Sequence, residues 1–195
     1  MKNFKLVIEY DGTAYCGWQR QKNDPTIQEA IETAISNMTH QRITLNGSGR
    51  TDAGVHAYGQ VANFCCETRL TADVFLKGLN GLLPDDIVIR ACEPVSETFH
   101  ARYDAKSKTY RYRILNQAIP AALYRQYAWH IKKTLNMESM QAKEGFSRHP
   151  ARYTEASLVK KLEEMGIRQT MIRLSVGIED TSDIIHDLKE GLAAL

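Results

Sequence analysis

Residues 46–64 of this 195-residue chain read NGSGRTDAGVHAYGQVANF. The stretch has three glycines in its first nine residues, which predicts a turn, and the alternation after the turn predicts a strand over Val55–Thr68. Arg42–Asn46, which precedes the turn, is a second predicted strand, so the stretch as a whole predicts a β-hairpin. A hairpin needs one or two glycines, but it does not need Arg-Thr-Asp at its tip.

The segments on both sides of the hairpin predict the remaining elements. Phe4–Tyr10 and Ile87–Pro94 have the apolar character of strands, and residues 26–38 and 71–83 have apolar residues at helical spacing. The order strand–helix–strand–strand–helix–strand is the ferredoxin-like pattern, an α+β fold in which helices cover one face of an antiparallel sheet. The other face is then free for RNA, although the pattern does not choose between an RNA-binding platform and an enzyme.

Residues 99–133 are rich in basic and aromatic side chains. They contain eight Lys or Arg and one acidic residue, a local net charge of +7, together with five tyrosines and a tryptophan. Within them, residues 109–116 predict a strand with aromatic side chains on one face and basic ones on the other: Tyr110 and Tyr112, and Arg111 and Arg113. Cations can meet RNA phosphates and rings can stack on unpaired bases. The same composition also fits a solvated strand whose tyrosines belong to the core.

Composition excludes several other classes of protein. No run approaches the roughly 18 apolar residues of a membrane span, and the first residues lack the features of a signal peptide. We therefore expect a cytoplasmic protein without membrane contact. The four cysteines are not spaced as metal ligands among themselves or with histidine, so we expect reduced thiols and no metal site.

Asp52 lies in the turn between Arg50 and His56. In one interpretation the carboxylate forms an ion pair that stabilises the loop. In another it is catalytic. A general base would want a second acid or a nucleophilic partner, and the turn offers neither. A nucleophile needs only one aspartate, with an arginine to keep it ionised and oriented, and the flanking glycines would let a bulky substrate approach. The turn alone leaves these alternatives open.

The string GRTDAGVHAYGQVANF resembles the signature of the TruA family of tRNA pseudouridine synthases. The segments LVIEYDGTAYCGWQRQ, PTIQEAIE, LKGLNGLLPDDI and FHARYDAKSKTYRYRI, and the run through to LNMES, resemble the same family in the same order, so the resemblance covers about residues 3–141. It implies a reaction without cofactor or metal, in which a uridine in the anticodon stem–loop of tRNA is isomerised to pseudouridine. It also implies a symmetric homodimer.

The resemblance assigns roles to single residues. Asp52 matches the essential aspartate, which either attacks the sugar or abstracts a proton. Tyr110 matches the tyrosine that packs against the flipped-out base, and its alternative role is core packing. Arg50 lies in the matched motif and would organise the aspartate or a phosphate. We expect the substrate RNA to be bound by five side chains: Tyr110, Arg50, Arg111, Arg113 and His56.

The tail differs from that family, so we divide the chain into a synthase portion, residues 1–141, and a tail, residues 142–195, of short α/β character. Residues 146–167 resemble a segment of type IA topoisomerases. Residues 170–195 resemble the C-terminus of PLP-dependent Cys/Met-metabolism enzymes, in which the arginine matching Arg173 binds the substrate carboxylate. Neither piece brings catalytic parts, so no activity is carried over. The tail elements that we expect are helices 156–165 and 181–195 and strand 173–178.

Members of the synthase family have a second, similar half, whose arginine pairs with the catalytic aspartate. The tail stands in its place, and the chain reads as a composite. Three functions follow as alternatives: a tRNA pseudouridine synthase, an RNA-binding remnant without turnover, and a chimera without RNA function. Four tail arginines are candidates to replace the missing one: Arg148, Arg152, Arg168 and Arg173.

Overall fold

The computed structural model describes residues 1–135 and 171–176. The chain consists of two compact units, residues 1–106 and 107–195, and each is described by itself. In the part of the chain that the structure describes, no helix combines the length and apolar character that crossing a membrane requires.

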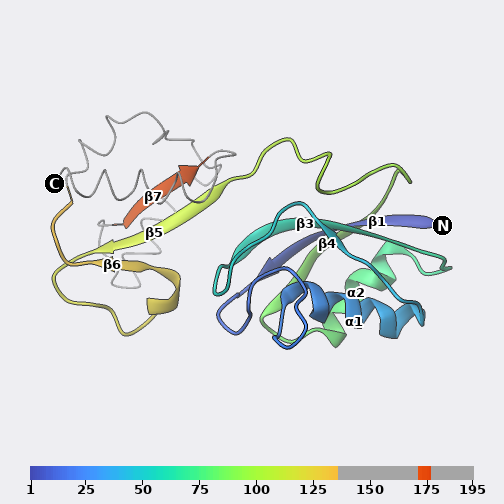
Figure 1. Cartoon of the computed structure of the whole chain (residues 1–195), viewed down its shortest axis with the longest axis horizontal. Helices are drawn as coiled ribbons and strands as arrows, with labels where there is room; N and C mark the ends of the chain where they lie inside the picture. The colour runs from blue at the N-terminus through green and yellow to red at the C-terminus, as the bar shows by residue number, and fades with distance from the viewer. Residues whose placement is uncertain (136–170, 177–195) are drawn as a thin grey trace. The chain divides into compact units, whose positions relative to one another are not determined.

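The first unit is a four-stranded sheet with two helices (Figure 1). Its elements follow the predicted order: β1 (Lys2–Tyr10), α1 (Ile27–Thr39), β2 (Asn46–Gly47), β3 (Ala57–Cys66), α2 (Ala72–Leu82) and β4 (Ile87–Val95). The strand order is β2-β3-β1-β4, and all neighbouring strands are antiparallel. Both helices lie on the same face of this sheet. This is the ferredoxin-like arrangement, so the α+β prediction is confirmed.

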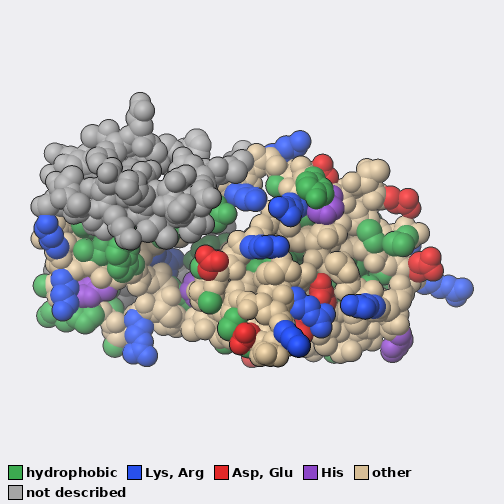
Figure 2. All heavy atoms as spheres, viewed as in Figure 1, with side chains coloured by type: hydrophobic (Ala, Val, Ile, Leu, Met, Phe, Trp, Pro, Cys, Tyr) green, Lys and Arg blue, Asp and Glu red, His purple; other side chains and the backbone are tan. Residues whose placement is uncertain are grey.

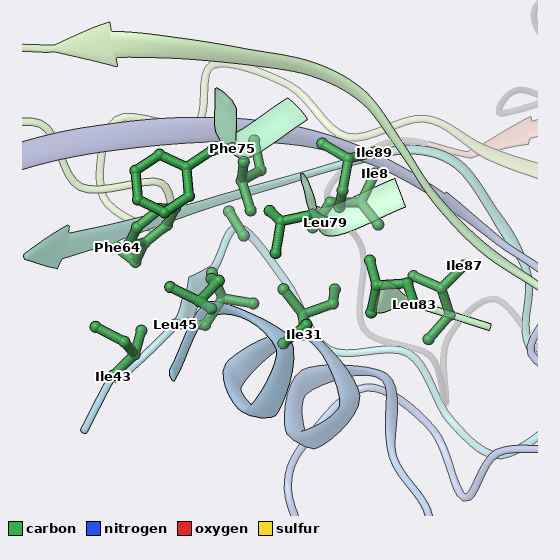
Figure 3. Close-up of a cluster of buried hydrophobic side chains, with 14 of the residues drawn as sticks. Ile8, Ile31, Ile43, Leu45, Phe64, Phe75, Leu79, Leu83, Ile87 and Ile89 are labelled. Atoms are coloured by element: carbon green, nitrogen blue, oxygen red, sulfur yellow. The ribbon is translucent and has the colours of Figure 1, made fainter. Parts of the chain in front are cut away.

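The core of the first unit lies between the sheet and its helices. Alternate residues of β1 point to the helices, because side chains alternate along a strand, and Leu6 and Ile8 are completely buried. Phe4 stacks on Phe64 of β3 with ring centroids 5.5 Å apart, and Phe75 of α2 meets Phe64 edge-on at 5.2 Å. Figure 3 shows that the labelled side chains of both helices and the sheet converge on this cluster.

The predicted strand Arg42–Asn46 was largely wrong, since only Asn46 and Gly47 form β2. Side chains of α1 supply the hydrogen bonds that a neighbouring strand would otherwise make. The backbone N–H of Leu45 donates to the Glu32 carboxylate at 2.9 Å, and its carbonyl accepts from the Gln28 amide at 3.0 Å. Ile43 and Leu45 are buried, so the alternation that predicted a strand reflects an extended segment packed under α1.

Strand β3 begins at Ala57, two residues later than predicted, because the N–H of Val55 is used to close a turn on the carbonyl of Asp52. Helix α1 begins after Thr26, whose hydroxyl accepts a hydrogen bond from the N–H of Glu29. The helix ends at Thr39, and His40, which caps it, has a left-handed conformation with φ of 55°.

The second unit contains a three-stranded sheet in the order β6-β5-β7 (Figure 1). Its described elements are β5 (Tyr110–Asn116), the 3-10 turn η1 (Arg125–Tyr127), β6 (Trp129–Ile131) and β7 (Met171–Val176). Strand β6 is parallel to β5, and β7 is antiparallel to it. Strand β7 begins two residues before the predicted strand 173–178 and overlaps most of it. The predicted helices 156–165 and 181–195 lie outside the described residues.

Candidate active site

The loop that connects β2 to β3, residues 48–56, carries Asp52 and is called the Asp52 loop below. The Gln60 side-chain amide of β3 donates to the carbonyl of Gly49 at 2.6 Å and so fixes the start of the loop. Further along, the N–H of Val55 donates to the carbonyl of Asp52 at 3.2 Å. The backbone on the C-terminal side of Asp52 is therefore folded into a turn of defined shape.

A second loop, residues 11–18, runs beside the Asp52 loop and is hydrogen-bonded to it. The N–H of Trp18 donates to the carbonyl of Thr51 at 2.9 Å, and the N–H of Gly54 donates to the carbonyl of Tyr15 at 3.3 Å. These two bonds lie on either side of Asp52 in the sequence. The position of Asp52 is thus set by backbone contacts with a neighbouring loop.

Glycines allow this close approach of the two loops. Gly17 has φ of +88°, and a Cβ added to it would overlap the carbonyl oxygen of Thr51. A Cβ on Gly12 would overlap the carbonyl of Val55. Any larger side chain at these positions would push the loops apart, because the atoms in the way belong to the backbone.

Buried aromatic side chains tie the Asp52 loop to the core. The hydroxyl groups of Tyr10 and Thr51 are hydrogen-bonded at 2.8 Å, and burial raises the pKa of Tyr10. Trp18 is 2% exposed, and its ring centroid lies 6.1 Å from that of Tyr10. A Cβ on Gly47 would lie 2.6 Å from the Trp18 indole nitrogen, so this glycine makes room for Trp18 rather than for a substrate.

Asp52 and Arg50 are both exposed. Within residues 1–135 and 171–176, no hydrogen bond or ion pair joins the carboxylate of Asp52 to another side chain. The ion-pair interpretation of Asp52 is therefore not supported by this part of the structure. A carboxylate held by its backbone, with no side-chain partner among the described residues, can act on a bound molecule as a nucleophile or as a base.

His56 faces the turn at the end of β1. Its Nδ1 lies 3.1 Å from the N–H of Gly12 and 3.0 Å from Oδ1 of Asp11, but one nitrogen cannot accept from the first and donate to the second at once. Oδ1 of Asp11 already accepts from the N–H and the hydroxyl of Thr13. Both contacts are made at the same ring nitrogen of His56. His56 fastens the Asp52 loop to this turn.

Sequence reasoning missed the residues that brace this site from a distance. The hydroxyl of Tyr15 donates to Asp86 at 2.7 Å and links the second loop to the start of β4. Burial, followed by this hydrogen bond and the charge of Asp86, raises the pKa of Tyr15. The pairs Tyr15–Asp86 and Tyr10–Thr51 are remote in sequence, and the only local signal was the pair of glycines in residues 11–18.

The other predicted site residues lie on β5 in the second unit. Arg111 is exposed, whereas Tyr110 and Arg113 are half-buried. The structure thus places Asp52, Arg50 and His56 on one loop and the three β5 residues on one strand, in separate units.

Of the tail arginines, Arg173 lies in β7, and the other three candidates, Arg148, Arg152 and Arg168, lie outside the described residues. In the described residues, no group of three or more His, Cys, Asp or Glu could hold a metal ion.

Two family models match the chain. One is described as tRNA pseudouridine synthase and matches residues 6–104. The other is described as Cys/Met metabolism PLP-dependent enzyme and matches residues 101–193. The described residues of the second range contain no glycine and therefore no glycine-rich turn for the coenzyme's phosphate. No activity is assigned to this match. The resemblance of residues 146–167 to topoisomerases stays a prediction.

Curated relatives agree with the first model. The chain is 52% identical to tRNA pseudouridine synthase A of Acetivibrio thermocellus over 141 residues, which are 72% of this chain and 58% of that protein. It is 48% identical to tRNA pseudouridine synthase A of Ruminiclostridium cellulolyticum over 146 residues, 75% of this chain and 60% of that protein. The chain thus spans about 58–60% of these relatives. The matched range 6–104 includes β1 to β4 and the Asp52 loop, and the chain belongs to the tRNA pseudouridine synthase family.

Proposed function

We propose that this protein isomerises uridine to pseudouridine in the anticodon stem–loop of tRNA, with Asp52 as the catalytic residue. The observation that carries the proposal is the exposed Asp52 carboxylate, without a side-chain partner among the described residues, on a loop whose backbone is held from two sides. A reacting group needs both features, because it must reach the substrate and must not move away from it.

Two routes are open to Asp52. As a nucleophile it attacks C1′ of the ribose, and the glycosidic C–N bond breaks with its electron pair going to the uracil. The detached uracil turns, C5 attacks C1′ in place of the carboxylate, C5 loses its proton and N1 gains one. As a base, Asp52 instead removes the proton from C2′ of the ribose, the C2′–H electron pair forms a C1′–C2′ double bond, and the uracil leaves with the electron pair of the glycosidic bond. C5 then bonds to C1′ as Asp52 returns the proton to C2′, C5 loses its proton and N1 gains one. Neither route needs a metal or a cofactor.

The target nucleotide must leave its base stack to reach such a loop, because the reacting atoms are covered in folded RNA. Tyr110 is the proposed stacking partner of the flipped base, since an aromatic ring replaces part of the lost stacking. Arg111 and Arg113 are proposed to bind RNA phosphates, and Arg50 to orient Asp52 or a phosphate. For His56 the contact with Gly12 favours a positioning role.

The proposal also covers the division of the chain, its oligomeric state and its location in the cell. The synthase portion is residues 1–141 and the tail is residues 142–195, a division that the 141 to 146 matched residues in the relatives support. The protein works as a homodimer, which sedimentation velocity can test. It works in the cytoplasm, because tRNA is its substrate, and fractionation of cells can test this.

The deciding experiment uses the full chain and an unmodified tRNA transcript. Asp52→Asn should abolish pseudouridine formation, measured by mass spectrometry of digested RNA, and should leave RNA binding within about twofold of wild type, because a single exposed carboxylate makes little difference to phosphate binding. Asp24→Asn is the matched control, since Asp24 is also an exposed loop aspartate of the first unit.

Each result decides between the proposed functions. Turnover by the wild type and by Asp24→Asn but not by Asp52→Asn supports the synthase. Binding by all three proteins without any pseudouridine supports the alternative, an RNA-binding remnant without turnover. Turnover by Asp52→Asn at the wild-type rate would remove Asp52 from the chemistry, and absence of RNA binding by the wild type would end both proposals.

A further inference from the structure

Two polar side chains of α1, those of Gln28 and Glu32, are buried in the first unit. They are 8% and 5% exposed, respectively. Nε2 of Gln28 donates a hydrogen bond to Oε1 of Glu32 at 3.0 Å, since residues four apart on a helix are neighbours. Buried polar groups need hydrogen-bond partners, so the further partners of this pair show which segments it joins.

On one side the pair holds the segment that leads to the Asp52 loop. The N–H of Leu45 donates to Oε1 of Glu32, and the carbonyl of Leu45 accepts from Nε2 of Gln28. The Leu45 side chain is buried and belongs to the core cluster drawn in Figure 3. Only the two residues of β2 separate Leu45 from the Asp52 loop. The approach to this loop is therefore tied to α1 as well as to β3.

On the other side the pair holds the second loop and the residues that follow it. Oε1 of Gln28 accepts from the N–H of Arg20 and from the side-chain amide of Gln19, both at 2.9 Å. The N–H of Gln28 donates to the carbonyl of Trp18 at 3.0 Å. The guanidinium of Arg20 adds an ion pair with Oε2 of Glu32 at 3.2 Å.

Both sides of this network lead to Asp52. Trp18, whose carbonyl is held by Gln28, donates its own N–H to the carbonyl of Thr51, and Thr51 precedes Asp52. Leu45 holds the chain on the N-terminal side of the same loop. Loss of the Gln28 hydrogen bonds would therefore loosen the two segments that support the Asp52 loop.

We propose that Gln28 and Glu32 are positioning residues for Asp52. They fix the backbone of the second loop and of the segment before β2, and these two segments hold the Asp52 loop. The inference rests on the proposed function, because its kinetic consequence is the rate at which Asp52 reacts. A reacting group displaced by about 1 Å can lose about a hundredfold in rate, so buried hydrogen bonds remote from the substrate can control turnover.

The effect should fall on turnover and not on tRNA affinity. Both side chains are buried, so neither offers a surface to RNA. Figure 2 shows acidic and basic side chains interspersed over the visible face of the first unit, so this face presents no surface of a single charge that the loss of one buried carboxylate would alter. Substitutions in the network should therefore lower kcat and leave KM for tRNA nearly unchanged.

The test measures pseudouridine formation by the full chain on an unmodified tRNA transcript, at a temperature at which every variant is folded. Gln28→Met keeps an unbranched side chain of similar length without its hydrogen bonds, and it should lower kcat about tenfold or more with KM within about twofold of wild type. Glu32→Gln keeps an acceptor oxygen and loses the ion pair with Arg20, so it should lower kcat less.

Ile35→Val is the matched control for stability. Ile35 is completely buried on the same helix, and the loss of one methylene should lower the melting temperature without changing kcat. The expected order of kcat is therefore Ile35→Val at the wild-type value, then Glu32→Gln, then Gln28→Met. If Gln28→Met does not fold, the comparison of Glu32→Gln with Ile35→Val decides.

A second measurement does not depend on activity. Hydrogen exchange followed by NMR reports the N–H of Trp18, which donates to Thr51 and not to either side chain of the pair. Its exchange should accelerate about tenfold in Gln28→Met, less in Glu32→Gln, and stay at the wild-type rate in Ile35→Val, because only the first two substitutions loosen the loop locally. A wild-type exchange rate of this amide in both network variants would overturn the inference.

The outcomes also separate this inference from the proposed function. If the wild type forms pseudouridine and neither network variant has a lower kcat than Ile35→Val, the inference fails and the proposed function stands. A rise in KM with unchanged kcat would likewise contradict a positioning role. If the wild type forms no pseudouridine, the proposed function fails, and the exchange of the Trp18 amide then decides by itself whether the network holds the loop.

Discussion

The two units of this protein differ in what stabilises them. In the first, 19 buried hydrophobic residues form one cluster between the sheet and its helices. In residues 107–135 of the second unit, Ile114 and Leu135 are the buried hydrophobic residues. The same range contains Lys and Arg but no Asp or Glu. A large core can hold a loop rigidly, whereas the described residues of the second unit are joined mainly by strand pairing. The residue proposed for the chemistry lies in the first unit, and the β5 residues proposed to contact RNA lie in the second.

The largest expected effect is on the core. Phe64→Ala should lower the free energy of unfolding by about 3–5 kcal/mol, because it leaves a cavity beside Phe4 and Phe75. Urea denaturation followed by circular dichroism measures the change. Val74→Ala on α2 is the control, since Val74 is 44% exposed, and it should change stability by less than about 0.5 kcal/mol.

Ile114→Ala is the corresponding truncation of a buried side chain in the second unit. Ile114 is 1% exposed and lies opposite Ile172 of β7. Hydrogen exchange should accelerate in β5 and stay unchanged in β1 and β3. A simultaneous loss of protection in both units would contradict the view that they are stabilised separately, because it would mean that they unfold as one.

A smaller effect is expected from the glycines beside Asp52. Gly17→Ala should cost about 1–2 kcal/mol for its positive φ and more for the overlap of the new Cβ with the carbonyl of Thr51. It should also slow pseudouridine formation, because Thr51 precedes Asp52. The measurements are the unfolding free energy and the rate of product formation on tRNA.

Gly54→Ala is the matched variant, because Gly54 has φ of +77° and no atom within 4 Å of an added Cβ. It should show the conformational cost alone. Equal effects of the two substitutions on stability and rate would show that the contact between the two loops does not matter for the site.

The smallest effect concerns the half-buried thiol of Cys92 in the first unit. Burial, with the charges of Asp73, Glu93 and Cys66 in smaller part, raises the pKa of Cys92 from 9.0 to about 12. The folded state then binds a proton that the unfolded state loses between these values, so stability should fall as pH rises from 9 towards 12 and be unaffected below 9. Cys92→Ala should make this fall shallower in urea denaturation series. Tyr15 contributes a fall of the same sign.

Thiol alkylation at pH 9 gives a direct check on the same burial. Exposed Cys65 should react well before Cys92, because the thiolate is the reactive form and Cys92 is largely protonated there. Equal labelling rates of the two residues in the folded protein, read by mass spectrometry, would contradict the assigned environment of Cys92.

The sequence predicted most of the first unit because its elements follow simple periodicities. The alternation in β1 and the helical spacing in α1 each reflect one buried face, and a local pattern shows such a face directly. The strand predicted over Arg42–Asn46 was largely wrong for a physical reason. Its alternation is real, but Gln28 and Glu32 complete the hydrogen bonds of Leu45, and no sequence pattern distinguishes side-chain partners from a neighbouring strand.

The arrangement around Asp52 was predicted only in part. That Asp52 is the catalytic residue stays a prediction from the motif. The glycines indicated close approach, but Gly47 accommodates Trp18 and not a substrate. The contacts of Thr51 with Tyr10 and Trp18 depend on how distant segments pack. In the second unit, the three-residue strand β6 is too short to give a pattern, and the pairing of β7 with β5 joins segments that the sequence does not relate.

The place of β1 in the sheet has a consequence for the order of folding during synthesis. Strand β1 is central in the sheet and is synthesised first. Its Phe4 pairs with Phe64 on one side and with Pro94 on the other, and both partners are synthesised later. A nascent chain that has exposed only β1 and α1 has no strand partner for either edge of β1. Because such non-local pairings close late, the first unit should gain protease resistance in one step, once β4 has left the ribosome.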